Sequence, residues 1–386
     1  MRPEDFIENP PGEVETVDGI FAFSPDPLPP DLDATHELLT ENGNAMYSIG
    51  QLSDLDTWLD SPEVILSPLI HREAVDSSNI ETTTRLTLSD IYRREAGEKP
   101  GQTETERADI AEAQNYVEAI TTGIQALREG TELDRDLLCR LHEILLQGAR
   151  GEQKNPGEFR NDIVGIDKPG TPLSEARFVP TPPASIPYAL RSLLQYIRSG
   201  PTYAPLIDLA LIHYQFETIH PFQDGNGRLG RLLVMLALYK WDLLPGPYLY
   251  PSSYFNANRD TYLDKLLAVS RDGAWAEWVS FFVQAISEQG REAYTVAREL
   301  LALRDRYREQ YQGQGAVIRE LIDFMIEHPY LTESQAVDVL NRSQPAVNQA
   351  IRRLWNDDIL RETTGQQRNR QYEASDVLEI VEPYNP

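Results

Sequence analysis

Helical periodicity runs through most of the chain, and this feature constrains the fold more than any other. From His36 onward, apolar residues recur at the three- and four-residue spacing of helices, with polar breaks between the segments. We expect helices at 36–52, 62–76, 84–95, 104–128, 134–148, 187–199, 205–219, 228–243, 252–271 and 274–310. The chain is therefore predicted to be mainly α-helical.

Side-chain packing must supply the stability of this fold, because the 386-residue chain has a single cysteine, Cys139. One thiol excludes a disulfide framework and a cysteine-based zinc site. A hydrophobic fraction of 41% is enough for sizeable cores. No apolar run approaches the roughly 18 residues of a membrane-spanning helix, and the N-terminus lacks the basic and apolar regions of a secretion signal. We expect a soluble, cytoplasmic protein with no membrane partner.

Changes in composition divide the chain into four predicted parts. Proline and acidic residues crowd the first part and leave little room for helices, so we expect an extended arm there. A polar loop around Gly97–Thr103 separates the two helical parts that follow. The four parts are the arm at 1–35, an N-terminal helical region at 36–103, a core at 104–311 and a C-terminal module at 312–386.

The C-terminal module has a pattern of its own. Helices near 314–328, 332–341 and 344–356 precede the segment Arg361–Tyr372, which is typical of a β-wing with Gly365 at its tip. Three helices followed by a wing predict a winged helix-turn-helix.

Charge bears on what this module could bind. The chain has 35 Lys and Arg residues against 61 Asp and Glu residues, a formal net charge of −26. Such a field repels nucleic acid unless basic residues cluster locally. The module does contain such a cluster: Arg352, Arg353, Arg361, Arg368 and Arg370. DNA binding through 344–372 therefore stays open, although acidic neighbours oppose it and winged helices also serve as dimerisation or protein-docking modules.

A stretch between the helices differs in kind. Two short β-like runs, Ile163–Ile166 and Arg177–Val179, lie on either side of a turn-rich centre. This pattern predicts a β-hairpin.

One loop combines the residue types that serve phosphate chemistry. Residues 220–231 read His-Pro-Phe-Gln-Asp-Gly-Asn-Gly-Arg-Leu-Gly-Arg and lie between two apolar helices. A helix N-terminus offers unpaired backbone N–H groups and a partial positive charge. Gly225 and Gly227 permit backbone shapes that let an anion approach closely. A Gly-Asn-Gly by itself is usually only a turn, but the complete string is far more specific and predicts a phosphate site.

The side chains of the same loop add chemistry to this prediction. Arg228 and Arg231 share one helical turn, where two cations oppose the helix dipole unless a polyphosphate pairs with them. Asp224 supplies a hard oxygen that suits Mg²⁺ held mainly by substrate phosphates and water. His220 is the nearby group whose ordinary pKa allows proton abstraction at neutral pH.

The string resembles the signature of the Fic family, His-x-Phe-x-Asp/Glu-Gly-Asn-Gly-Arg-x-x-Arg, at every defined position. The resemblance implies a Fic-type helical core with a small β-hairpin flap, and transfer of AMP from ATP to a Tyr, Ser or Thr hydroxyl of a target protein. In that activity His220 would deprotonate the hydroxyl and Asp224 would hold Mg²⁺. The nucleotide-binding residues that it implies are Gly225, Asn226, Gly227, Arg228, Leu229, Gly230, Arg231 and Tyr262.

The resemblance also implies separate roles in nucleotide binding for these residues. The Asn226 amide and the backbone around it would cradle phosphate oxygens, the two arginines would grip the β/γ end, and Tyr262 would lie in the adenine pocket. The flap at 160–180 would dock an extended target segment. Self-modification and a homodimer stay open. So do two alternative functions, transfer of another phosphate-containing group and a nucleotide-sensing transcriptional regulator that binds DNA.

A segment upstream of the core raises a further expectation. Taken alone, Ser78-x-x-Glu81 fits a capping box that starts a helix. Beside a Fic signature, the segment resembles the family's inhibitory motif, Ser/Thr-x-x-x-Glu-Gly/Asn, with Ser77 in its first position. The resemblance implies that Glu81 pairs with Arg231 where the γ-phosphate would bind, and so restrains activity. Thr82 departs from the motif, since the family usually has Gly or Asn there.

Overall fold

The computed structural model describes residues 1–33, 35–55, 63–82, 85–97, 103–168, 170–366 and 368–382. Most of these residues are helical, as the periodicity predicts. The helices are α1 (His36–Leu55), α2 (Glu63–Glu81), α3 (Leu88–Glu95), α4 (Glu104–Arg128), α5 (Arg135–Leu146), α6 (Ile186–Ser199), α7 (Pro205–Ile219), α8 (Asn226–Lys240), α9 (Ser252–Ala257), α10 (Arg259–Asp272), α11 (Trp275–Gln310), α12 (Ala316–Glu327), α13 (Glu333–Leu340), α14 (Gln344–Asn356) and α15 (Ser375–Val381).

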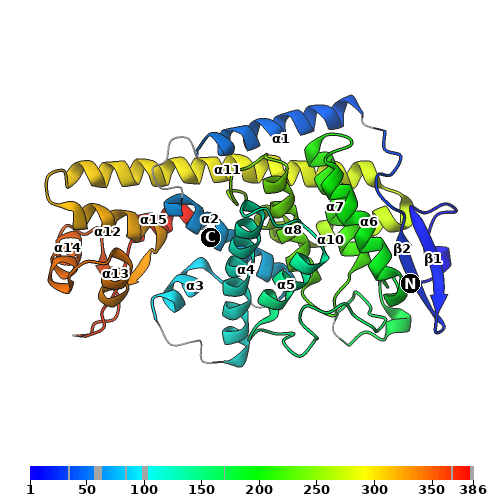
Figure 1. Ribbon diagram of the computed structural model, residues 1–386, viewed down its shortest axis with the longest axis horizontal. Coiled ribbons are helices and arrows are strands. Elements are labelled where there is room, and N and C mark those ends of the chain that lie inside the picture. Colours follow the sequence, from blue (N-terminus) through cyan, green and yellow to red (C-terminus); the bar gives the residue numbers. More distant parts are fainter. Residues whose placement is uncertain are drawn as a thin grey trace.

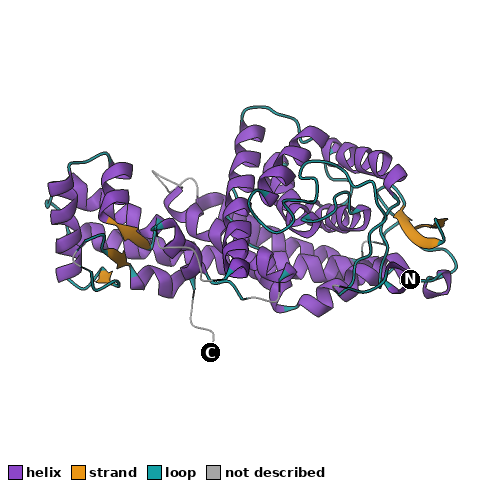
Figure 2. Cartoon of the chain, turned by 90° about the horizontal axis from the view of Figure 1, so that it is seen from below, coloured by secondary structure: helices purple, strands orange, loops and turns teal. Residues whose placement is uncertain are grey.

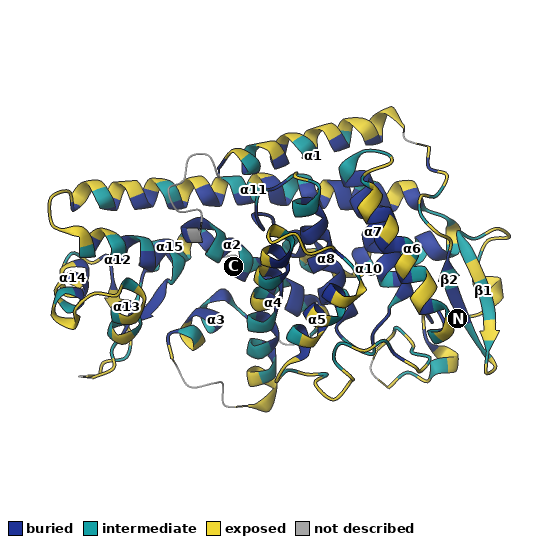
Figure 3. Ribbon diagram, viewed as in Figure 1, coloured by how far each residue is buried: buried dark blue, intermediate teal, exposed yellow. Residues whose placement is uncertain are grey.

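The longest helix, α11, organises the molecule. It runs along the long axis from the core to the C-terminal module, and α1 packs beside it (Figure 1). One face of α1 is buried and the opposite face is exposed (Figure 3), as expected of an amphipathic helix laid on a core. Beneath this pair, α2, α4, α7 and α8 pack against one another.

Helices α7 and α8 form the centre of the core. Nearly every residue of both helices is buried, which is typical of helices that are surrounded by protein on all sides. The loop that joins α7 to α8 is therefore held at both ends by rigid, buried elements.

In the described part of the chain, no helix is both long and apolar enough to cross a membrane.

The first residues differ from the extended arm that we predicted at 1–35. Strands β1 (Gly12–Val17) and β2 (Ile20–Pro25) form an antiparallel hairpin. Its turn residues, Asp18 and Gly19, both have positive φ (52° and 79°), as a type I′ turn requires. An Asp-Gly pair between apolar runs is a hairpin signal, and the surrounding prolines obscured it.

The hairpin predicted within 160–180 is also corrected by the structure. In this range, only one isolated bridge forms among the described residues, between Ile166 and Phe178. Pro172 leads into a turn of 3₁₀ helix at Leu173–Glu175. The β2 strand lies beside this segment instead, because the N–H of Phe23 donates to the carbonyl of Val179 (2.9 Å).

Several helix boundaries differ from expectation, and α8, for example, spans Asn226–Lys240 in place of the expected 228–243. Helix α2 continues to Glu81, so Ser78-x-x-Glu81 ends a helix and is not a capping box that starts one. The helix expected at 252–271 is divided at Asn258, where φ and ψ of −116° and 35° leave the helical region.

The C-terminal module contains α12 to α15 and a small antiparallel sheet. Strands β3 (Tyr330–Thr332), β4 (Arg361–Glu362) and β5 (Gln371–Glu373) pair in the order β3-β5-β4. This order of helices and strands is the one that a winged helix requires, and that assignment stays a prediction. The module and the β1-β2 hairpin lie at opposite ends of the molecule (Figure 2).

Candidate functional site

His220 lies at the point where α7 ends. It adopts a left-handed backbone conformation (φ 50°, ψ 61°), and its N–H donates to the carbonyl of Phe216 (2.9 Å). The ring Nδ1 lies 3.3 Å from the carbonyl of Glu217, which favours a proton on Nδ1 and a free lone pair on Nε2. Burial lowers the pKa of His220 to about 4, and the Arg160 charge acts in the same direction. The imidazole is therefore neutral at pH 7 and can accept a proton.

Arg160 supports this turn, and the sequence analysis did not single it out. Its guanidinium is buried and donates to the carbonyls of His220 (2.8 Å), Asp162 (2.9 Å) and Thr181. Burial lowers the pKa of Arg160 to about 10. The partners of this arginine are backbone carbonyls from distant segments, so no local pattern could have revealed its role.

Asp224 and Gly225 lie directly before α8. Gly225 has φ 75°, a left-handed conformation that glycine adopts without strain. The carboxylate of Asp224 accepts from the N–H of Gly225 (2.7 Å), yet 43% of its side chain is exposed. Among the described residues, no group of three or more His, Cys, Asp or Glu residues could enclose a metal ion. One exposed carboxylate oxygen fits a magnesium ion that takes its other ligands from phosphates and water.

Asn226 has a different role from the one that the family resemblance implies. Its side chain is only 2% exposed and clamps one residue of the loop. The amide oxygen accepts from the N–H of Phe222 (2.9 Å), and the amide nitrogen donates to the carbonyl of Phe222 (2.8 Å). The amide therefore shapes the loop from within and is not free to bind phosphate.

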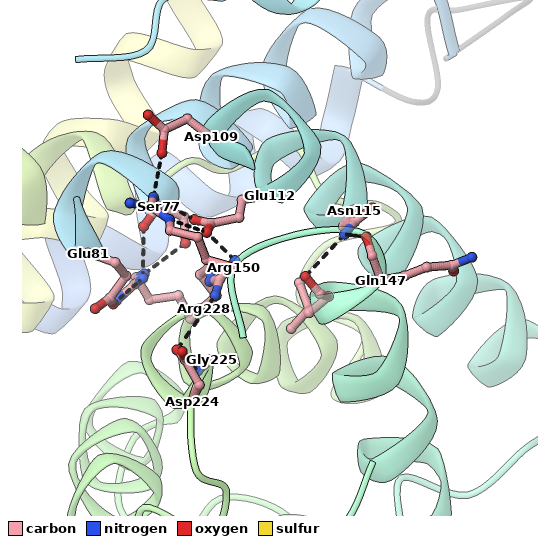
Figure 4. Close-up of polar contacts among 12 residues, drawn as sticks. Ser77, Glu81, Asp109, Glu112, Asn115, Gln147, Arg150, Asp224, Gly225 and Arg228 are labelled. Atoms are coloured by element: carbon pink, nitrogen blue, oxygen red, sulfur yellow. Dashed lines mark hydrogen bonds and ion pairs between the residues drawn. The ribbon is translucent and has the colours of Figure 1, made fainter. Parts of the chain in front are cut away.

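Substituting Asn226 by alanine should destabilise the loop measurably. Asn226→Ala is expected to lower the free energy of unfolding by about 2–4 kcal/mol, because each buried backbone group left unpaired costs about 1–3 kcal/mol. Urea denaturation followed by circular dichroism would measure this change. The matched control is Asn115→Ala, which removes donors to the carbonyls of Leu145 and Gln147 at a half-buried site (Figure 4). Equal losses in the two variants would contradict the clamp.

Arg231 connects the loop to the predicted inhibitory motif through hydrogen bonds. Its Nε donates to the Ser77 hydroxyl (2.9 Å), and one terminal nitrogen donates to the Ser77 carbonyl (2.9 Å) and to Glu81 Oε1 (2.8 Å). The side chain is 1% exposed. Burial alone would lower the pKa of Arg231, but the charges of Glu81, Tyr262 and Glu217 and the hydrogen bond to Glu81 together outweigh burial and raise the pKa above its ordinary value. Figure 4 shows Ser77 and Glu81 on the helix that faces the loop.

Gly227 is required by the position of Glu81. A Cβ atom at residue 227 would lie 2.1 Å from Glu81 Oε1, well inside contact distance. The Glu81 carboxylate thus lies directly against the first turn of α8, where backbone N–H groups are available to an anion.

Arg228 lies near other carboxylates. It is 3% exposed, and a terminal nitrogen lies 3.3 Å from Glu112 on α4. Arg150 pairs with the same glutamate (2.8 Å) and with Asp109, so four charged groups form one network (Figure 4). Another terminal nitrogen of Arg228 lies 3.9 Å from Asp224. The structure therefore brings Arg231, but not Arg228, together with Glu81.

The remaining candidates lie inside the core. Leu229 is fully buried, so only its backbone could contact a nucleotide. Tyr262 is buried as well, and its hydroxyl lies 2.7 Å from Nε2 of His213. His213 is packed among aromatic rings, including those of Phe255 and Trp278, as expected of a core histidine. The structure does not bring Tyr262 to an open surface of the loop.

Sequence comparisons agree with this arrangement. Residues 132–238 match the Fic/DOC family, and residues 39–125 match the Fic/DOC family N-terminal region. The chain is 26% identical over 173 residues to a probable protein adenylyltransferase of Aquifex aeolicus, a match that covers 44% of this chain and 51% of the relative. It is 27% identical over 115 residues to protein adenylyltransferase fic-1 of Caenorhabditis elegans, covering 29% of this chain and 20% of that protein. The chain thus spans about half the length, or less, of these curated relatives.

Solved structures share the fold. A crystal structure of a Fic family protein from Desulfovibrio desulfuricans G20 aligns with a TM-score of 0.57 at 22% identity, covering 90% of this chain and 98% of that chain. Fic-1 from C. elegans aligns with a TM-score of 0.52 at 18% identity, covering 69% of this chain and 74% of that one. The matched regions, the signature loop and the shared fold show that this chain belongs to the Fic/DOC family.

Proposed function

We propose that this protein is a protein adenylyltransferase, which transfers AMP from ATP to a hydroxyl side chain of a target protein and is restrained by Glu81. The observation that carries the proposal is the loop from 220 to 231, in which a neutral histidine at the end of α7 precedes the N-terminus of α8. The names of the curated relatives support the same class of reaction.

The proposed reaction is an in-line displacement at the α-phosphorus. His220 Nε2 accepts the proton of the target hydroxyl, the hydroxyl oxygen bonds to the α-phosphorus, and the bond to the α–β bridging oxygen breaks, so pyrophosphate leaves. Backbone N–H groups of the first turn of α8 hold the phosphate oxygens, and Arg231 holds the terminal phosphate. Asp224 would hold Mg²⁺, which neutralises phosphate charge when bound. Positioning and charge neutralisation supply most of the catalysis.

Target docking would use the flap at 160–180. The 177–179 segment is already paired along both edges, because the Val179 carbonyl accepts from Phe23 of β2 and Phe178 bridges to Ile166. An extended target segment would therefore add along Ile163–Gly165, where its backbone could pair without a specific side-chain sequence.

The contacts of two arginines in the C-terminal module bear on the alternative of a DNA-binding regulator. Arg353 pairs with Asp357 (3.0 Å), and the Arg370 guanidinium lies over the Trp355 ring, 5.3 Å from its centroid. Two of the five arginines in the predicted basic cluster thus have partners within the module, which weakens the case for DNA binding there.

Labelled ATP tests the proposed reaction. The Glu81→Gly protein, incubated with Mg²⁺ and a cell extract, is expected to leave label from the α-phosphate of ATP on protein, and none from the γ-phosphate. Label from the γ-phosphate would indicate phosphorylation instead. If the folded variant leaves no label on protein from the α-phosphate or from the γ-phosphate, the result would contradict a transferase that uses ATP.

A further inference from the structure

Glu217 is a carboxyl group that the proposed mechanism does not use. It lies on α7, one helical turn before His220, and its Oε1 is buried without a hydrogen-bond partner in the described part of the chain. A buried acceptor left unpaired costs free energy, so its retention beside the loop needs an explanation.

The position of Glu217 mirrors that of Glu81. A Cβ atom at Gly230 would lie 2.3 Å from Glu217 Oε1, just as one at Gly227 would lie 2.1 Å from Glu81 Oε1. Two glycines three residues apart on α8 therefore each make room for one carboxyl group. Each carboxyl group, when ionised, raises the pKa of Arg231, the residue that follows Gly230.

We infer that Glu217 is a second acidic partner of Arg231, which pairs with the guanidinium once Glu81 has left and thereby competes with the terminal phosphate of the nucleotide. This inference rests on the proposed function. It makes Glu217 a positioning residue, since it acts on the nucleotide only through Arg231.

The charges around Glu217 explain why it does not already hold Arg231. The groups that face it are Glu81 on α2, Arg231 on α8 and Tyr262 on α10, with His220 following on its own helix. Burial raises the pKa of Glu217 to about 8, with Arg231 opposing and Glu81 reinforcing this rise. While Glu81 occupies Arg231, Glu217 is therefore mostly protonated at pH 7.

Removal of Glu81 reverses this balance. The pKa of Glu217 then falls, because a like charge has left and Arg231 remains, so Glu217 loses its proton and pairs with Arg231. A nucleotide that brings its own negative charge to Arg231 must displace this carboxylate, and the displaced group takes up a proton again. Nucleotide binding to the unrestrained protein is thus coupled to proton uptake above neutral pH.

Calorimetry measures this coupling directly. The Glu81→Gly protein is titrated with Mg²⁺ and a non-hydrolysable ATP analogue at pH 8, in two buffers with different ionisation enthalpies. We expect uptake of a substantial fraction of a proton on binding. Adding Glu217→Gln should abolish the uptake and strengthen binding by roughly three- to tenfold, whereas adding Glu118→Gln, at an exposed position on α4, should change neither quantity.

Each outcome of this experiment is decisive. Binding without proton uptake, or uptake that survives Glu217→Gln, would overturn the role of Glu217 while leaving the proposed function intact. No binding by the folded Glu81→Gly protein would overturn the proposed function itself. Because absence of proton uptake in the Glu81→Gly protein would already overturn the role of Glu217, the inference can be refuted even if the second variant does not fold.

Discussion

Replacing His220 by alanine is expected to lower the rate of AMP transfer by roughly 10²–10⁴-fold, the usual contribution of a general base. Affinity for the nucleotide should change little, because the proposed phosphate contacts come from Arg231 and the backbone of α8 and not from the imidazole. Transfer of α-phosphate label by Glu81→Gly/His220→Ala, compared with Glu81→Gly, measures the first quantity, and calorimetry measures the second.

A matched control separates catalysis from the loss of any imidazole. His36, exposed at the start of α1, is the suitable position, and His36→Ala should leave both rate and affinity unchanged. If His220→Ala weakened nucleotide binding but kept turnover, the assignment of His220 as the base would be wrong.

Replacing Glu81 by glycine is expected to raise the rate of AMP transfer by roughly 10- to 100-fold. Glu81 holds Arg231 through an ion pair of 2.8 Å, and a hydrogen bond to a charged group contributes about 1.5–3 kcal/mol, where each 1.4 kcal/mol corresponds to a factor of ten. Removing the carboxylate frees the guanidinium for the terminal phosphate. Steady-state transfer rates of the wild-type and variant proteins test this.

The control for this variant is another glutamate at the C-terminal end of a helix. Glu129 caps the C-terminal end of α4 at the surface, far along the sequence from the loop, so Glu129→Gly removes a similar charge and should leave the rate unchanged. A folded Glu81→Gly protein with equal or lower activity would show that Glu81 does not restrain the enzyme.

The sequence was most informative where function depends on short spacing. The residues from His220 to Arg231 lie within one loop and the first turns of one helix, so their order alone predicts a phosphate site. The pairing of Glu81 with Arg231 joins residues 150 positions apart, and only the family resemblance pointed to it. The structure then supplied the hydrogen bonds.

The positions that sequence analysis missed depend on contacts between distant segments. Arg160 acts on backbone carbonyls of other segments, and Glu217 is informative only because Gly230 and Arg231 lie beside it. Asn226 belongs to the signature, yet its amide faces inward to Phe222, and no spacing rule tells an inward amide from an outward one.

The predictions of β-structure were wrong for different reasons. The turn at Asp18-Gly19 carried a valid local signal that the proline-rich flanks outweighed. The runs at Ile163–Ile166 and Arg177–Val179 had suitable composition, but the Val179 carbonyl pairs with β2. Pairing partners of short strands are decided by tertiary contacts more than by local preference.

The most direct test of the proposed site is a crystal structure of the Glu81→Gly protein with Mg²⁺ and a non-hydrolysable ATP analogue. We expect the terminal phosphate against Arg231, phosphate oxygens on the backbone of α8, and the α-phosphorus facing Nε2 of His220. An empty loop at saturating analogue, or an imidazole directed away from the α-phosphorus, would contradict it.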